Sequence, residues 1–296
     1  MPWLIAFVAL ATCPSANAHH AGAADSLAIE PWAAACLAAG AFVYALGVSR
    51  LWRRAGRGRG IATAHVARFA IGWLILCVAL MPPLDGMGER SFAAHMVQHE
   101  LLMAIAAPLL VLGRPLEAWA WALAPAWRSH VRALTHSNWF AAAWHAITQP
   151  LAAWMLHAIA VWAWHVPALF EAALASTAVH ILQHTSFLGT ALLFWWSVFD
   201  RRPRNTGGAA LASLFTTMGH TGALGALLTF GARLWYRSYA GAFGLTALED
   251  QQLGGLIMWG PASLAYLAAA LVIASRWLLP PRHIAGSSAA PSRPSC

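Results

Sequence analysis

Seven long runs of apolar residues divide the 296-residue chain. A hydrocarbon core about 30 Å thick needs roughly 20 consecutive apolar residues to be crossed by one helix. The runs lie approximately at residues 31–50, 62–81, 92–112, 147–166, 178–199, 209–230 and 252–275. The segments between them are punctuated by Pro, Gly and charged residues, as expected of connections. The pattern predicts an all-α, polytopic membrane helical bundle with about seven transmembrane helices.

The composition supports the same fold class. Hydrophobic residues make up 60% of the chain and charged residues only 9%, and the mean hydropathy is +0.59. A soluble globule of this size needs more polar surface than this chain can supply. We therefore expect the lipid bilayer to cover most of the outer surface.

Arginine placement predicts the orientation of the bundle. The net charge of +8 is typical of some nucleic-acid-binding proteins, but the basic residues are all Arg and gather in short connections. Fourteen lie in the first, third and fifth connections or in the C-terminal tail, Arg68 lies near the inner end of the second run, and three lie opposite. Arginine-rich connections are cytoplasmic. We expect the N-terminus outside, the C-terminus in the cytoplasm, and no nucleic-acid partner.

The two ends of the chain carry weaker signals. Residues 1–18 end in Ala-Asn-Ala after an apolar run and resemble a signal peptide, although no basic residue precedes that run. Residues 19–280 would then form the seven-helix membrane domain, and residues 281–296 a disordered cytoplasmic tail. The cysteines show no metal-binding spacing; they are Cys13, Cys36, Cys77 and Cys296.

Two histidine pairs are the main candidates for chemistry. Residues 95–99 begin the third apolar run, residues 180–184 begin the fifth, and both read H-x-x-Q-H. Histidines four residues apart lie on the same helical face, so each pair offers two imidazoles to one small volume. Both helices run inward from the outside, which puts the pairs at matching depth. The predicted ligands are His95, His99, His180 and His184, with Gln98 and Gln183 beside them.

The fourth and sixth runs carry further histidines. His157 and His165 are eight residues apart, which places them about 12 Å apart along one side of a helix. We expect His165 to reach the layer of the two pairs, His157 to lie deeper, and His220 to lie near the membrane midplane. A single histidine inside a span often bonds a carbonyl or hydroxyl of a neighbouring helix, so both roles stay open for His157 and His220.

Methionine placement favours copper as the metal. Several methionines lie towards the outer half of the bundle, namely Met81, Met87, Met96, Met103 and Met155. Imidazole suits copper, zinc and iron, whereas a thioether favours Cu(I). Taken singly, each methionine is explained equally well by packing. Glu100, directly after His99, is a candidate for neutralising a bound cation or orienting an imidazole, and alternatively an interfacial carboxylate.

Four stretches in order carry a family resemblance: HMVQHELLMAIAAPLLVLGRP, HAIAVWAWHVPALFEAAL, HILQHTSFLGTALLFWW and DQQLGGLIMWGP. With them the chain resembles, from about residue 60 to 275, the bacterial CtaG family of cytochrome c oxidase assembly factors, first associated with caa-type oxidases. The resemblance implies a multi-pass protein of the bacterial plasma (inner) membrane. It also implies haem-copper oxidase subunits as partners and copper handling as the role.

The last of these stretches has a physical interpretation. Asp250 and Gln251 lie at the outer mouth of the final run, and Gly254 with Gly255 would let another helix approach closely. Met258, two turns below Asp250, would then face the bundle. We treat Asp250 as a candidate for orienting a metal ligand through a hydrogen bond, without contacting the metal itself, and Met258 as a candidate further ligand.

The favoured interpretation is an accessory protein, not an enzyme. It would bind copper at its extracytoplasmic side through the two pairs, with help from His165, and assist metal loading of a haem-copper oxidase. No nucleophile with its base, phosphate-binding loop or catalytic carboxylate pair is evident. Three alternatives stay open: a b-type haem or quinone-linked redox protein, a membrane metalloenzyme, and a metal-free scaffold for oxidase subunits. The sequence does not indicate an oligomeric state.

Overall fold

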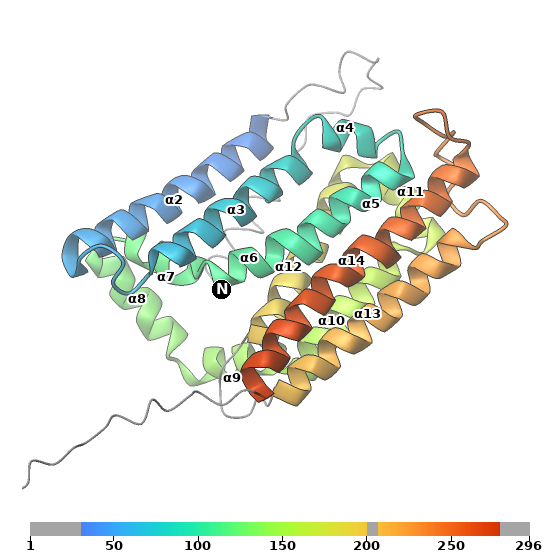
Figure 1. The fold of residues 1–296 in the computed structure, drawn as a ribbon. Coiled ribbons are helices and arrows are strands. Elements are labelled where there is room, and N and C mark those ends of the chain that lie inside the picture. The colour runs from blue at the N-terminus through green and yellow to red at the C-terminus, as the bar shows by residue number, and fades with distance from the viewer. Residues whose placement is uncertain (1–30, 200–206, 279–296) are drawn as a thin grey trace, which may run out of the picture.

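The computed structural model describes residues 31–199 and 207–278, and the regular structure within them is helical (Figure 1). In chain order the elements are α2 (Pro31–Ala55), α3 (Thr63–Leu80), α4 (Leu84–Gly88), α5 (Phe92–Glu100), the π-helix η2 (Leu101–Ala106), α6 (Ala107–Leu112), α7 (Pro115–Ala122), α8 (Pro125–Thr135), α9 (Asn138–Ile147), α10 (Pro150–Trp164), α11 (Pro167–Ala175), α12 (Thr177–Phe199), α13 (Gly207–Thr229) and α14 (Ala247–Leu278). The expected signal segment 1–18 and tail 281–296, with Cys13 and Cys296, lie outside the described residues.

Within residues 31–199 and 207–278, five helices are long and apolar enough to cross a membrane, which confirms the expected all-α, multi-pass class. They are α2, α3, the continuous helix α5–η2–α6, α13 and α14. α9 and α10 make a sixth if they are counted together, but they are bent by 60° at a short break. We had expected one unbroken run over residues 147–166. Pro150 explains the break, because proline cannot donate the helical hydrogen bond and disfavours a helical residue before it.

The remaining expected span, residues 178–199, corresponds to α12. It has 23 residues, but it is not among the candidate spans within the described chain. Two histidines and a glutamine lower its mean hydropathy. α12 instead packs against α6, α10, α11 and η2, so protein neighbours surround much of its surface. The direction in which each helix crosses the membrane stays a prediction.

The connections separate to the two ends of the bundle (Figure 1). α4, α11 and the connection between α13 and α14 lie together at one end, which we call the α4–α11 end. The arginine-rich connection between α2 and α3 lies at the opposite end, as does the last turn of α14. The structure thus places the first connection at the end opposite to α4, α11 and the connection between α13 and α14, whereas the orientation in the membrane stays a prediction.

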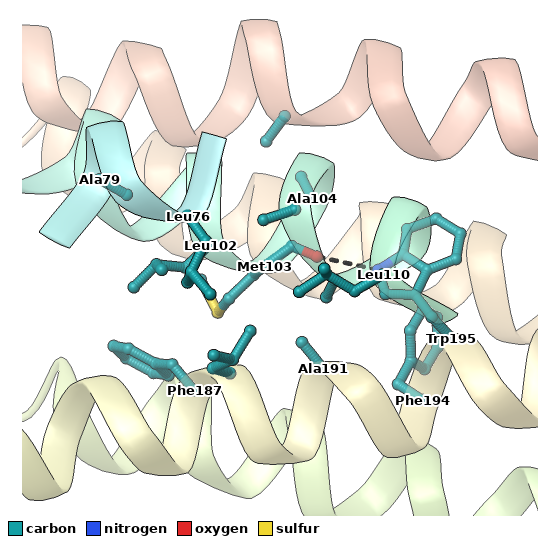
Figure 2. Close-up of a cluster of buried hydrophobic side chains, with 14 of the residues drawn as sticks. Leu76, Ala79, Leu102, Met103, Ala104, Leu110, Phe187, Ala191, Phe194 and Trp195 are labelled. Carbon is teal, nitrogen blue, oxygen red and sulfur yellow. Dashed lines mark hydrogen bonds between the residues drawn. The ribbon is translucent and has the colours of Figure 1, made fainter. Parts of the chain in front are cut away.

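A π-helix interrupts the helix over residues 92–112. The N–H of Ala107 pairs with the carbonyl of Leu102, five residues back. In the same pattern the carbonyl of Met103 would pair with residue 108, which is proline and has no N–H. The indole N–H of Trp195 on α12 donates to that carbonyl instead, at 2.8 Å (Figure 2). Figure 2 also shows the apolar side chains that fill the space between these helices.

α13 and α14 approach each other closely at two glycines. A Cβ atom on Gly255 would lie 2.6 Å from the carbonyl oxygen of Gly225, and one on Gly225 would lie 2.7 Å from that of Gly255. Neither backbone position can accept a side chain without separating the helices. This contact supports α14, which in turn packs against α5.

We expect Gly255→Ala to destabilise the protein by about 1–3 kcal/mol, because the added methyl group overpacks a backbone contact. Gly260→Ala on the same helix is the matched control, since a Cβ there meets nothing within 4 Å. The measurement is reversible unfolding of the detergent-solubilised protein by titration with sodium dodecyl sulfate. Equal stability of the two variants would contradict the close-contact interpretation.

Candidate metal centre

The two histidine pairs face each other between α5 and α12. The ring centroids of His95 and His180 lie 5.3 Å apart, and those of His99 and His184 lie 5.2 Å apart. Within each helix the rings of a pair are 4.3 and 4.2 Å apart, as expected for residues one turn apart. The spacing that was read from the sequence therefore corresponds to one shared volume at the α4–α11 end.

Three of these histidines have the geometry of a metal site. His95, His180 and His184 each offer one ring nitrogen, and these nitrogens lie within 4.8 Å of one another. A metal with bonds of about 2.0 Å to nitrogen holds its ligand nitrogens roughly 3.4 Å apart. The three nitrogens would therefore need to close by at most about 1.4 Å, which rotation of the side chains can supply.

The Nε2 atoms of the cluster have no hydrogen-bond partner among the described residues. This holds for all five histidines of the cluster, which we define as His95, His99, His165, His180 and His184. An unsatisfied buried polar atom is unfavourable by about 1–3 kcal/mol. Five such atoms in one place fit a shared ligand, and neutral imidazole nitrogen is a good ligand for copper, zinc and iron.

His165 joins the cluster from α10. Its ring centroid lies 6.3 Å from that of His99, and its side chain is buried. Its Nδ1 lies 2.7 Å from the carbonyl oxygen of Val161. A carbonyl can only accept, so Nδ1 carries the proton and Nε2 presents a lone pair. Metal-binding histidines are commonly oriented in this way.

Asp250 holds the start of the helix that carries the first pair. Its fully buried carboxylate accepts hydrogen bonds from Ser91 Oγ at 2.7 Å, from the Phe92 N–H at 2.7 Å and from the Ala93 N–H at 3.2 Å. A carboxylate at a helix N-terminus is stabilised by the unpaired N–H groups and the helix dipole. The structure thus places Asp250 on the backbone that begins α5, one turn before the cluster.

The two glutamines of the H-x-x-Q-H motifs have different surroundings. Gln98 donates to the carbonyl of Ala79 and to Asp85 Oδ1, both at 2.7 Å, and so ties α5 to α3 and α4. Gln183 is fully buried, and its side-chain amide lies close enough to His95 to act on that imidazole. Neither amide atom makes a regular hydrogen bond among the described residues.

Asp85 is a site residue that the sequence patterns did not single out. Its carboxylate accepts from Gln98 and interacts electrostatically with His180. It lies in α4, a helix of five residues that is too short to show a periodicity relating it to the histidines.

Four aromatic side chains close the cluster from the α4–α11 end, and none had been singled out from the sequence. We call Phe92, Phe170, Tyr236 and Tyr239 the aromatic cover. Phe170 packs against His95 at 5.2 Å and against Tyr236 at 4.2 Å between ring centroids. The Tyr236 hydroxyl donates to the carbonyl of His165 at 2.9 Å. Burial, and then the Glu171 carboxylate, raise the pKa of Tyr236, so this hydroxyl stays a donor.

His157 and His220 lie deeper in the bundle. His157 Nδ1 is 3.2 Å from Thr190 Oγ1, and its ring stacks on Phe194 at 5.4 Å. The indole of Trp162 donates to His220 Nδ1 at 3.3 Å. The contacts found for them among the described residues are thus with other side chains of α10 and α12, and their Nε2 atoms are unpartnered there as well.

The remaining candidates lie on the other side of α5. A Cβ on Gly254 of α14 would meet Phe92 and the Met96 side chain, so Met96 lies in the α5–α14 interface. Met258, one turn beyond Gly254, is buried on the same helix. Glu100 is buried and acts electrostatically on Tyr266, also on α14. The structure therefore places Met96 and Glu100 of α5 towards α14, which carries Met258, whereas the first histidine pair faces the second pair on α12.

Comparisons with known proteins identify a family. Residues 42–279 match the profile of the family described as cytochrome c oxidase caa3 assembly factor (Caa3_CtaG). An uncharacterized protein of Mycobacterium leprae (strain TN) is 26% identical over 252 residues, which cover 79% of this chain and 37% of the relative. The chain thus spans little more than a third of the length of that relative. No solved structure matches.

We expect Asp250→Ala to lower the free energy of unfolding by about 2–4 kcal/mol, because it leaves three donors at the start of α5 without their acceptor. Glu249→Ala, at the exposed neighbouring position, should lower it by less than about 1 kcal/mol. Both values come from unfolding titrations in the same detergent. An effect of Asp250→Ala as small as that of Glu249→Ala would argue against the capping role.

Proposed function

The chain belongs to the cytochrome c oxidase caa3 assembly factor family, and from that premise we propose that it binds copper for its partner oxidase. The ligands would come from His95, His180 and His184, with His99 and His165 beside them. The observation that carries this proposal is the convergence of five buried Nε2 atoms that lack a partner among the described residues.

The donor set is compatible with copper, and the family makes copper the favoured metal. The three-histidine group consists of imidazoles alone, and among divalent first-row metals copper binds nitrogen ligands most tightly. A haem-copper oxidase also requires copper, which makes copper the natural cargo of a factor that assists its metal loading. Zinc has the same ligand preference, so the metal analysis described below measures both.

Metal transfer suits this site better than catalysis. A catalytic metal keeps a coordination position open for water or substrate. Here His99 and His165 lie beside the three-histidine group, and either imidazole could occupy the position that a catalytic metal keeps open. We therefore infer a carrier, not an enzyme.

The arginine distribution supports a location for the site. We place the α4–α11 end on the extracytoplasmic side of the bacterial plasma membrane, because the opposite end holds the arginine-rich connection between α2 and α3. Oxidase subunits would then meet the protein at the end where the cluster lies.

The ring contacts argue against haem at this position. The imidazoles of α5 and α12 lie 5.2–5.7 Å apart between centroids, and Phe187 packs against His99 at 4.6 Å. A macrocycle between the two helices would have to push these rings apart. An absorption spectrum nevertheless tests this alternative directly.

We expect the purified wild-type protein, loaded with Cu(I) without oxygen and then desalted, to retain copper. A variant with His95, His180 and His184 replaced by Ala should lose it, because the three nitrogens that define the site are gone. The matched control replaces three exposed histidines outside the cluster, His130, His136 and His145. Metal content is measured by mass spectrometry, with circular dichroism to confirm folding.

Each alternative has its own result. A Soret band in the wild type would support the haem protein. Failure of the folded wild type to retain any metal would support a scaffold in which the histidines serve only packing. Copper retained equally by both triple variants would place the metal outside the cluster and overturn the proposal.

A further inference from the structure

An open cleft lies beside the cluster, between α11 and the connection that follows α13. Its volume is about 660 Å³, and its walls include Pro167, Glu171, Arg233, Trp235 and Arg237. The two arginines are exposed, whereas the indole of Trp235 is half-buried. The cleft therefore combines two positive charges with an apolar wall.

Glu171 does not neutralise these arginines. Its carboxylate accepts hydrogen bonds from the backbone N–H groups of Arg237 and Ser238 and from the Ser238 hydroxyl. Among the described residues the ion pair found is Arg114–Glu117, elsewhere in the fold. Glu171 thus holds the connection in place, and both guanidinium groups keep their hydrogen-bonding capacity for another molecule.

The wall of the cleft is joined directly to the histidine cluster. Tyr236, between Trp235 and Arg237, is buried and donates to the carbonyl of His165. Pro167, on the opposite wall, lies two residues after the same histidine. A molecule seated in the cleft would touch the segments that flank one side of the cluster.

We propose that the cleft docks a carboxylate-bearing surface of the oxidase subunit that exchanges metal with the cluster. This inference rests on the proposed function. Arginine binds carboxylates through two parallel hydrogen bonds, and Trp with Arg is the pair of residue types that most often dominates binding energy at protein interfaces. Opposite charges would also steer the two proteins together at the end where the cluster lies.

An anionic lipid headgroup shares the affinity for arginine, but the cleft favours a protein. Its volume is large for one phosphate, and Trp235 with Leu234 offers apolar surface beside the charges. The hydrogen bond from Tyr236 to the His165 carbonyl joins the cleft wall to the cluster. A partner that exchanges metal would make use of this connection, whereas a lipid headgroup would not.

The test measures binding of the cytochrome c oxidase purified from the same organism to the metal-free chain in phosphatidylcholine nanodiscs. Arg233→Glu and Arg237→Glu should each weaken binding at least tenfold, and the wild-type affinity should fall as salt rises. Arg90→Glu is the matched control, because Arg90 is also exposed but lies outside the residues that line the cleft. Vesicles containing phosphatidylglycerol serve as a second probe.

Three results would overturn the docking proposal. The first is that the oxidase does not bind the wild type. The second is that Arg90→Glu weakens oxidase binding as much as Arg233→Glu and Arg237→Glu do. The third is that the two cleft variants lose vesicle binding but keep oxidase binding, which would identify a lipid headgroup as the occupant. Copper retention by the arginine variants separates this proposal from the proposed function. Retained copper with unchanged oxidase binding would reject the cleft and leave the metal site standing, whereas wild type that binds oxidase but no copper would do the reverse.

Discussion

The buried carboxylate of Asp250 against the first turn of α5 is the contact on which the rest of the site depends. A fully buried charge persists only where donors surround it, and here Ser91, Phe92 and Ala93 supply them. The contact joins α5 to α14, which is itself fixed against α13 by paired glycines. The depth and rotation of the first histidine pair therefore follow from an interaction outside the cluster.

α12 contributes to the site twice, at different depths. Its first turns carry the second histidine pair, and near its other end Trp195 satisfies the carbonyl that the π-helix and Pro108 leave without a donor. The wide turn lies directly after His99 and Glu100. Wide turns of this kind occur often at functional sites. Here it changes the face that the helix presents between the histidines and α6.

The features predicted from the sequence depend on spacing within one helix, and the features that it did not predict depend on contacts between residues far apart in the chain. Apolar runs and histidines four residues apart are properties of one helix, so the all-α membrane class and the convergence of the pairs could be read directly. Asp85 reaches the cluster from the five-residue helix α4 and Tyr236 from the connection between α13 and α14, and no helical period relates either residue to the histidines. The break before Pro150 was missed because hydropathy does not report backbone geometry. The opposite holds for α12: its polar residues lower its mean hydropathy, and it packs against other helices of the protein.

The aromatic cover bears on how fast an ion could leave the histidine cluster, not on how tightly the cluster would bind it. Phe170 and Tyr236 are both buried, and their rings pack 4.2 Å apart between centroids at an interplanar angle of 35°, so they cover this side of the imidazoles. If the cluster holds an ion as proposed, displacement of these two rings and of the Tyr236 hydrogen bond would add to the barrier for its release. A partner that displaces the segment around Tyr236 would then speed release of the ion, so slow release without the partner would not require very high affinity.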